Sequence, residues 1–164
     1  MRYTEIKTID VANGPGIRVS LWVQGCSHHC KGCFNAETWD FNGGKQFTQK
    51  EIDYIKELLS DDVVQKHFSI LGGDPLEPVN HYMLENLLIQ LKEKYPHLNI
   101  WLWTGYSWEQ IKHLNFLKYI DVIVDGEFIE EKKDLRLKFK GSSNQRTINV
   151  KESLKNNNVV LMDL

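Results

Sequence analysis

The chain has 164 residues, of which 41% are hydrophobic, and this size and apolar content are typical of one domain spanning residues 1–164. Its 20 lysines and arginines are interspersed with 22 aspartates and glutamates, so the formal net charge is only −2. This balance gives no indication of a nucleic-acid partner or of binding to a membrane surface. No apolar run approaches the roughly 20 residues that a membrane-spanning helix needs.

The first third of the chain contains one predicted strand and the start of one predicted helix, on either side of a cysteine-rich loop. Residues 1–15 carry no strong periodicity and end in a turn at Asn13–Gly16, which glycine and proline favour. Apolar and polar side chains alternate over Ile17–Val23, and this period of two predicts a strand. Thr48–Glu51 is a capping box, which satisfies free amides at a helix start, so we expect a helix to begin there.

The middle of the chain repeats the order strand, loop, helix. Strands are predicted at His67–Leu71, Asn99–Trp103 and Tyr119–Val124, and a helix with inward-facing leucines at about Asn80–Lys94. A second capping box at Ser107–Gln110 predicts the start of a further helix. Parallel strands joined by helices are the natural result of this order.

The last part of the chain has weaker patterns. Leu135–Phe139 alternates like a strand, and Arg146–Val150 predicts another. The stretches Glu130–Asp134 and Glu152–Asn158 look least structured. The predicted fold class is α/β, a partial (open) β/α barrel of mostly parallel strands with flanking helices, because a complete eight-unit barrel needs more than about 200 residues.

All three cysteines of the protein lie within one short loop, Gly25–Asn35. Three residues separate Cys26 from Cys30 and two separate Cys30 from Cys33, so the three thiolates can converge on one point. Three thiolates are one short of the four that normally hold a cubane iron–sulfur cluster, which would leave one iron open to a substrate. An odd number of cysteines disfavours a disulfide framework. Clustered free thiols suit a reducing cytoplasm.

Zinc is the alternative metal on spacing alone. His28 or His29 could complete a set of three cysteines and one histidine, which tetrahedral zinc accepts. We expect both histidines to be solvated instead. A zinc-stabilised binding module therefore stays open as the alternative from another functional class, and it would be colourless where an iron–sulfur protein is brown.

Four groups of unusual residues each follow a predicted strand. They are the cysteines, Gly72–Asp74, Thr104–Tyr106 and Asp125-Gly126. Loops that follow parallel strands lie at one edge of the sheet, because right-handed crossovers return the chain to the same side. Periodicity alone therefore predicts one functional site at this edge.

Several motifs resemble those of known enzymes. The Cys-x3-Cys-x2-Cys spacing resembles the cluster motif of the radical S-adenosylmethionine (SAM) enzymes. Asn13–Arg18 before the cysteines and Phe34–Trp39 after them are similar to the branch whose members install glycyl radicals. Over about residues 1–150 the chain resembles the family that activates anaerobic (class III) ribonucleoside-triphosphate reductase. This resemblance rests on the segments Gly72–Leu76, Trp103–Tyr106, Val124–Phe128 and Gly141–Gln145.

The resemblance implies a partial barrel of the radical SAM type, a 4Fe-4S cluster and an oxidoreductase activity. Cys26, Cys30 and Cys33 would hold the cluster, and the open iron would take the amino and carboxylate groups of SAM. An electron from the reduced cluster would break the bond between the SAM sulfur and C5′. The resulting 5′-deoxyadenosyl radical would take a hydrogen atom from a glycine of the reductase. The implied partners are this glycyl-radical subunit and an electron donor such as a flavodoxin, with no nucleic acid and no membrane.

The resemblance also implies residues around the methionyl end of SAM. Gly72 and Gly73 lack side chains and would let backbone approach the amino group of SAM. Backbone carbonyls or the Asp74 carboxylate would accept its hydrogens, although the family at large often has the longer Glu at this position. We expect a branched side chain at Gly73 to fill this approach and weaken SAM binding. An ordinary turn is the alternative reading of these residues.

The ribose and adenine side of SAM has further candidates. By resemblance, Thr104 and Tyr106 would contact the ribose or the base, with a strand end that caps the next helix as the alternative. Asp125 is either a further ligand contact or part of a turn. Many radical SAM proteins carry an aromatic residue before the third cysteine, where this chain has Gly32, so we expect the adenine to stack differently or against Phe34.

The sequence also offers an alternative enzyme class and structural interpretations of several segments. The activase of pyruvate formate-lyase is the nearest enzymatic alternative, because it shares Gly14–Arg18 and the cysteine loop. We favour a structural turn for the Asn13–Arg18 segment and a core or wall position for Trp101 and Trp103. Gly141–Arg146 is either a flexible polar loop or a place for SAM or the partner.

Overall fold

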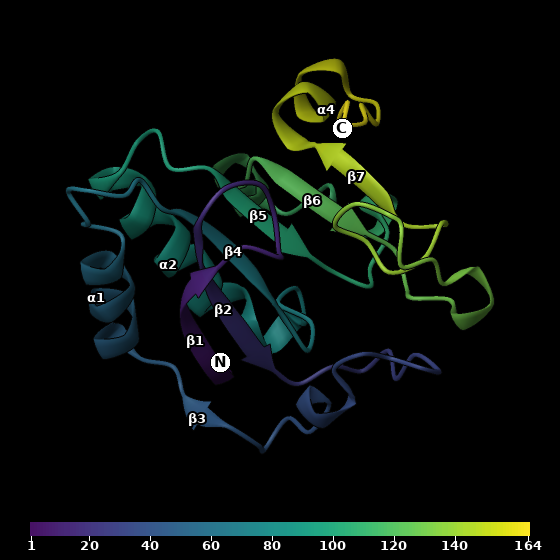
Figure 1. Cartoon of the computed structure of the whole chain (residues 1–164), viewed down its shortest axis with the longest axis horizontal. Helices are drawn as coiled ribbons and strands as arrows, with labels where there is room; N and C mark the ends of the chain where they lie inside the picture. The colour runs from purple at the N-terminus through teal and green to yellow at the C-terminus, as the bar shows by residue number, and fades with distance from the viewer.

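Seven strands form one sheet in the order β3-β1-β2-β4-β5-β6-β7 in the computed structural model, which describes residues 1–164 (Figure 1). The strands are β1 (Arg2–Asp10), β2 (Arg18–Gln24), β3 (Lys45–Gln46), β4 (His67–Gly72), β5 (Ile100–Trp103), β6 (Val122–Asp125) and β7 (Arg146–Asn149). The α-helices are α1 (Gln49–Leu58), α2 (His81–Lys94), α3 (Trp108–Ile111) and α4 (Val150–Asn156). Short 3-10 helices are η1 (Ala36–Thr38), η2 (Pro78–Asn80), η3 (Asn115–Tyr119) and η4 (Glu130–Lys132).

The centre of the sheet is parallel, which confirms the α/β class with mostly parallel strands. Strands β2, β4, β5 and β6 pair parallel, whereas β1 pairs antiparallel with β2 and β3, and β7 pairs antiparallel with β6. The sheet runs from β3 to β7 without closing. Its assignment as a partial barrel of the radical SAM type stays a prediction.

The helices of the structure include no candidate for a membrane-spanning segment, since each is too short or too polar.

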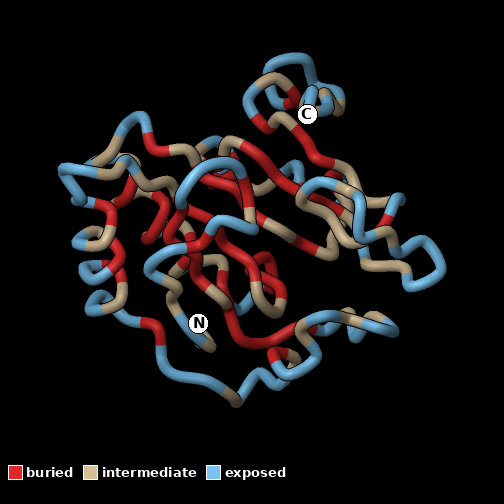
Figure 2. Tube along the Cα trace, viewed as in Figure 1, coloured by how far each residue is buried: buried red, intermediate tan, exposed pale blue.

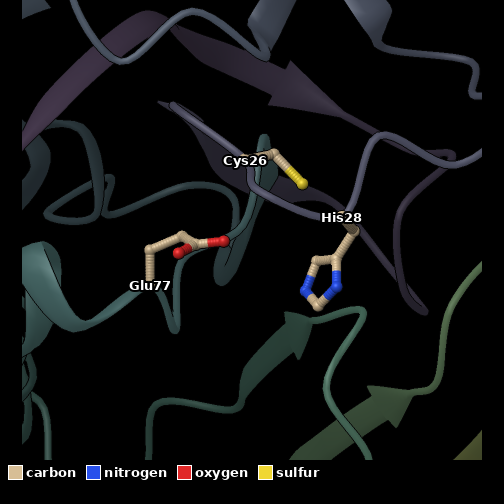
Figure 3. Close-up of side chains that lie close together, drawn as sticks. All are labelled: Cys26, His28 and Glu77. Atoms are coloured by element: carbon tan, nitrogen blue, oxygen red, sulfur yellow. The ribbon is translucent and has the colours of Figure 1, made fainter.

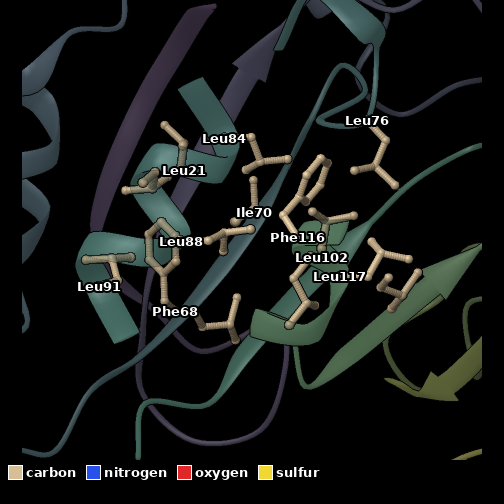
Figure 4. Packing of buried hydrophobic residues seen from close by; sticks show 14 of the residues in the cluster. Leu21, Phe68, Ile70, Leu76, Leu84, Leu88, Leu91, Leu102, Phe116 and Leu117 are labelled. Carbon is tan, nitrogen blue, oxygen red and sulfur yellow. The ribbon is translucent and has the colours of Figure 1, made fainter. Parts of the chain in front are cut away.

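One face of the sheet packs against the α-helices and holds the main hydrophobic core (Figures 2 and 4). Alternate residues of the strands, such as Val19, Leu21 and Val23 of β2, are fully buried there. The α2 side chains that the sequence places inward meet them: Leu84, Leu87, Leu88 and Leu91. Full burial of one leucine contributes roughly 1.5–3 kcal/mol, so this face, rather than helix propensity, holds α2 on the sheet.

The other face of the sheet is polar and aromatic. The buried apolar residues of all four α-helices belong to the first face, so no α-helix covers this one. A smaller cluster of Trp101, Val122 and Val124 packs here against Phe139. As expected, Trp101 is buried in the interior and Trp103 is a wall residue, lining a cavity on this face.

Local helix-start signals agree with the structure, and one strand is shorter than predicted. The Glu51 carboxylate accepts a hydrogen bond from the Thr48 amide at 2.7 Å, and the capping box at Ser107 is also present. Strand β6 begins at Val122 rather than Tyr119, because the residues before it form η3.

Strand β1 forms from residues in which the sequence shows no strong periodicity. It pairs with β2, but the register shifts between Tyr3 and Glu5 and again between Lys7 and Asp10. A bulge sets two residues of one strand against one of its partner and interrupts the inside–outside alternation. Two bulges in nine residues therefore leave no period of two for sequence analysis to detect.

Two late segments also differ from expectation. The predicted strand Leu135–Phe139 is wrong, since the chain forms turns and bends there. The Asp134 carboxylate accepts from the Arg136 amide at 2.9 Å, and such local bonds compete with strand formation. Most of Glu152–Asn158, expected to be unstructured, lies in α4, which the Asn149 side chain caps.

Arg18, the first residue of β2, is fully buried and has no direct carboxylate partner. Its Nε donates to Ser69 Oγ at 2.6 Å and its Nη1 to the Pro15 carbonyl at 2.9 Å. Its Nη2 donates to the carbonyls of Phe68 at 2.9 Å and Asn99 at 3.0 Å. Burial lowers the pKa of this guanidinium to about 10. Arg18 thus ties the turn before β2 to β4 and β5, which supports the structural reading of that turn.

We expect Arg18→Ala to lower the free energy of unfolding by about 3 kcal/mol or more. The substitution leaves several buried acceptors without a donor, and each costs roughly 1–3 kcal/mol. Urea denaturation of the metal-free protein measures the change. Arg136→Ala is the matched control, because that side chain is 90% exposed and its ion pair with Asp134 is screened by solvent. Equal midpoints for the two variants would contradict this role of Arg18.

Candidate functional site

A cavity of about 420 Å³ lies where the parallel strands end. Its walls come from the cysteine loop after β2 and from the segments that follow β4, β5 and β6. Of the predicted site residues, the cavity is lined by Cys26, Cys30, Cys33, Phe34, Gly72, Gly73, Asp74 and Thr104. These residues come from three strand ends, and Gly126 after β6 adds the fourth, as the topological argument predicts. Tyr106 and Asp125 lie outside this lining.

The cysteine loop folds back on itself and presents three free thiols. Gly25 N donates to the Thr38 carbonyl at 2.7 Å, and Cys26 N donates to the Trp39 carbonyl at 3.2 Å. Cys26 is buried, whereas Cys30 and Cys33 are half-buried. Burial raises the pKa of the Cys26 thiol to about 12 and also raises that of Cys30. Thiolates at these positions therefore need a cationic ligand, and three free cysteines lining one cavity fit an iron–sulfur cluster.

Asp74 connects three of the strand-end loops through one buried carboxylate. It accepts from the Gly105 amide at 2.8 Å and from Thr104 Oγ1 at 2.9 Å. It also accepts from the Leu76 amide at 2.9 Å and lies 2.7 Å from His28 Nε2. Both oxygens are therefore occupied by donors of the protein itself. Asp74 positions the loops that form the cavity wall.

His28 is bound between two carboxylates, so the expectation that it is solvated is wrong. Its Nε2 lies 2.7 Å from Asp74 and its Nδ1 lies 3.1 Å from Glu127, and only 10% of the side chain is exposed. The hydrogen bond that His28 donates to Asp74 is the main cause that raises the pKa of His28 to about 9. A Cβ on Gly105 would lie 2.6 Å from the ring, so only glycine leaves room for it. His29, by contrast, is exposed and stacks on Trp39.

Cys26, His28 and Glu77 offer ligand atoms within 4.8 Å of one another and point toward a common space (Figure 3). Each oxygen of Glu77 nevertheless has a donor, Ser27 Oγ at 2.6 Å and Tyr106 Oη at 3.3 Å. Both ring nitrogens of His28 already have carboxylate partners, Asp74 at 2.7 Å and Glu127 at 3.1 Å. This group does not complete a zinc site, and the open alternative of a zinc-binding histidine loses its support.

Gly72 and Gly73 allow the loop after β4 to lie directly against the cysteine loop. Gly72 has a φ of +115°, which favours glycine, and a Cβ on it would meet the backbone of Val23 and Trp22. A Cβ on Gly73 would lie 2.8 Å from the carbonyl carbon of Gly25. We expected a side chain at Gly73 to fill the approach to SAM, but the first atoms it meets belong to the backbone of Gly25. Such a side chain would displace the cysteine loop itself.

Asp125 has a structural environment at the start of α3. Its Oδ2 accepts from the Trp108 amide at 2.7 Å and from Arg146 Nη2 at 2.6 Å. These contacts fix the helix start and hold β7 beside β6. Tyr106 packs edge-on against the His28 ring, with ring centroids 4.6 Å apart. Tyr106 and Asp125 thus support the residues that line the cavity.

The segment between β6 and β7 closes one side of the cavity and is better ordered than a flexible polar loop. Ser142 is fully buried, and its Oγ accepts from the Ile129 amide at 3.2 Å. The Gln145 side chain accepts from the Gly141 amide at 2.8 Å and donates to the Gly126 carbonyl at 2.9 Å. These bonds hold Gly141 and Gln145 in the cavity wall.

Sequence reasoning missed several aromatic residues of the cavity. Trp22, Phe128 and Phe139 line it. Trp22 alternates with the buried valines and leucine of β2, so its place on the opposite face could have been found from that period. Phe128 and Phe139 lie in an irregular segment, where no periodic signal exists.

Comparisons with known proteins agree with this site. Residues 12–148, which include all three cysteines, match the family described as "4Fe-4S single cluster domain". Proteins named anaerobic ribonucleoside-triphosphate reductase-activating protein are similar over most of the chain. The relative from Enterobacteria phage T4 is 43% identical over 89% of this chain and 92% of its own length. Those from Vibrio cholerae and Escherichia coli K12 are 43% and 38% identical, each over 88% of this chain and 96% of their own lengths.

The chain belongs to the family of anaerobic ribonucleoside-triphosphate reductase-activating proteins. This confirms the resemblance on which the sequence analysis relied. Membership favours an iron–sulfur cluster over zinc, because the matching domain is one that holds a single 4Fe-4S cluster. The cysteine loop, whose three free cysteines all line the cavity, is the site in this chain that fits such a cluster.

For this activating-protein homologue we expect Gly73→Ala to lower iron and sulfide content to less than half that of the unchanged protein. The added methyl group meets backbone atoms of Gly25, which cannot rotate away. Gly141→Ala is the control, because its methyl group meets only the ring edges of Phe34 and Phe128, at 3.0 Å and beyond. Iron and sulfide analysis after anaerobic reconstitution decides the matter, and full loading of Gly73→Ala would refute the proposed packing.

The raised pKa of His28 predicts a pH dependence of stability in the cluster-free protein. The folded state holds this proton up to about pH 9, whereas the ordinary pKa of histidine is 6.5. The stabilisation is therefore complete below pH 6.5 and is lost as the pH rises through 9. We expect the urea midpoint to fall across this window, and to fall less in His28→Gln. Identical pH profiles for the two proteins would show that His28 is not held as an imidazolium.

Proposed function

We propose that the protein activates an anaerobic ribonucleoside-triphosphate reductase by generating a glycyl radical on it, using a 4Fe-4S cluster and SAM. The observation that carries this proposal is the placement of three free thiols and the Gly72-Gly73 backbone around one cavity at the ends of parallel strands. Membership of the activating-protein family supports the choice of partner.

Cys26, Cys30 and Cys33 would hold the cluster and leave one iron without a protein ligand. When bound, the cluster supplies the electron that splits SAM into methionine and a 5′-deoxyadenosyl radical, which takes a hydrogen atom from the partner glycine. Every other task falls to the chain itself, which orients the bound groups and excludes water from them. We also propose that the protein works in a reducing cytoplasm and receives its electron from a donor such as a flavodoxin.

The cavity has the volume and chemistry for a ligand of the size of SAM. Its volume of about 420 Å³ lies within the range of small-molecule sites, roughly 300–1,000 Å³. Asp74 and Thr104 are engaged with each other, whereas the Gly73 carbonyl accepts no hydrogen bond from the protein. We therefore assign the methionyl amino group to this carbonyl rather than to the Asp74 carboxylate. Phe34 and Trp103 offer aromatic faces for the adenine.

The experiment that tests this proposal combines metal analysis with electron paramagnetic resonance. Replacing Cys26, Cys30 or Cys33 by Ala should abolish the four-iron cluster and SAM cleavage. His28→Ala and His29→Ala should keep the cluster, because both ring nitrogens of His28 are engaged by carboxylates and the exposed His29 ring stacks on Trp39. Loss of iron in either histidine variant would contradict the ligand set.

The partner is tested with the reduced, cluster-loaded protein and SAM. Anaerobic ribonucleoside-triphosphate reductase should give a glycyl radical signal, and pyruvate formate-lyase should give none. Replacing the target glycine of the reductase by Ala should stop radical accumulation without preventing complex formation. Equal activation of both enzymes would remove the narrow assignment and leave the broader class of glycyl-radical activases.

A further inference from the structure

The stretch Lys132–Lys140, in the segment between β6 and β7, concentrates positive charge beside the cavity, and three glutamates precede it in that segment: Glu127, Glu130 and Glu131. Within the nine residues Lys132–Lys140 it has five cationic side chains and one acidic one, Asp134. The cations are Lys132, Lys133, Arg136, Lys138 and Lys140. The whole chain has a net charge of −2, so this local excess is not a general property of the surface.

Most of these cations have no acidic partner in the protein. Arg136 pairs with Asp134 at 2.9 Å, but Lys132, Lys133 and Lys138 are exposed and no carboxylate lies within 4.0 Å of them. Lys140 donates to a backbone carbonyl at 3.0 Å and lines the cavity. Like charges so close together raise the local positive potential, which attracts an acidic surface.

Two apolar side chains lie at the opening of the same cavity. Leu135 is 82% exposed and Phe34 is 53% exposed, yet both line the cavity. The Lys133 ammonium lies 5.1 Å from the centre of the Phe34 ring, so the apolar and cationic groups adjoin. An apolar centre with a charged border is the composition of a protein-docking surface rather than of an ordinary solvated face.

We propose that Lys132–Lys140, together with Phe34, is the docking surface for an acidic patch of the reductase that borders its target glycine. The inference rests on the proposed function, because a reductase that delivers a glycine to this cavity must lie on the residues around its opening. The unpaired lysines would then attract aspartates or glutamates on the facing surface. Complementary charge of this kind acts mainly on the rate of association and on specificity.

The test reverses two charges that do not line the cavity, Lys132→Glu with Lys138→Glu. The control reverses Lys50 and Lys151, which are also exposed and unpaired but lie in the first turns of α1 and α4, where glutamate is favourable. Glycyl radical yield is measured against reductase concentration, with cluster-loaded protein, SAM and a small-molecule reductant. Cleavage of SAM without reductase serves as the basal activity.

The docking variant should need about tenfold more reductase at low salt, with basal SAM cleavage unchanged. The difference should shrink near 1 M salt, where the Debye length falls to about 3 Å. The same reductase dependence in both double variants would overturn the inference. A defect seen only when a protein electron donor replaces the small-molecule reductant would also overturn it, since the surface would then serve the donor. No radical with the unchanged protein would instead overturn the proposed function, and the inference with it.

Discussion

Backbone hydrogen bonds between the end of β2 and the loop after β4 set the geometry on which the site depends. Gly73 N donates to the Val23 carbonyl at 2.7 Å, and Asp74 N donates to the Gly25 carbonyl at 2.8 Å. They continue the parallel pairing of the two strands into the cysteine loop, one residue before Cys26. Side chains would force these two segments apart, so the glycines are as necessary to the thiol positions as the cysteines are. The cysteine loop is thus attached directly to two strand ends, which position functional side chains more precisely than loops alone do.

The Asp74 carboxylate extends this constraint from two strand ends to four. Its donors come from the cysteine loop and from the loop after β5, and His28 continues the network to Glu127 after β6. A buried carboxylate without donors would be costly, and the saturated arrangement makes each loop dependent on the others. The short side chain of Asp74 suits a residue that joins loops rather than one that reaches a ligand.

The parts of the fold that the sequence predicts are those with a regular period or a local signal. The alternation of β2, the leucine face of α2 and the capping box at Thr48 depend on near neighbours, and all three are present in the structure. The common edge of the cysteines and Gly72–Asp74 follows from topology. The burial of His28 could not be predicted, because it depends on carboxylates that are 46 and 99 residues away. Two bulges interrupt the alternation of β1, so its sequence shows no period of two. Near Leu135, a hydrogen bond to the Asp134 side chain favours a turn where a strand is predicted.

The open side of the cavity connects the fold to the proposed chemistry. The helices cover one face of the sheet only, and the irregular segment between β6 and β7 covers the other face in part. Leu135 and Phe34 are left exposed where the cavity meets solvent. A carbon radical must be kept from water and stray hydrogen donors, and enclosure is the usual means. Under the proposed function, the reductase is the substrate and also covers the open side of the cavity. The surface that delivers the glycine thereby excludes water from the site. A small activase can leave its cavity open, because the radical is useful only when the partner is in place.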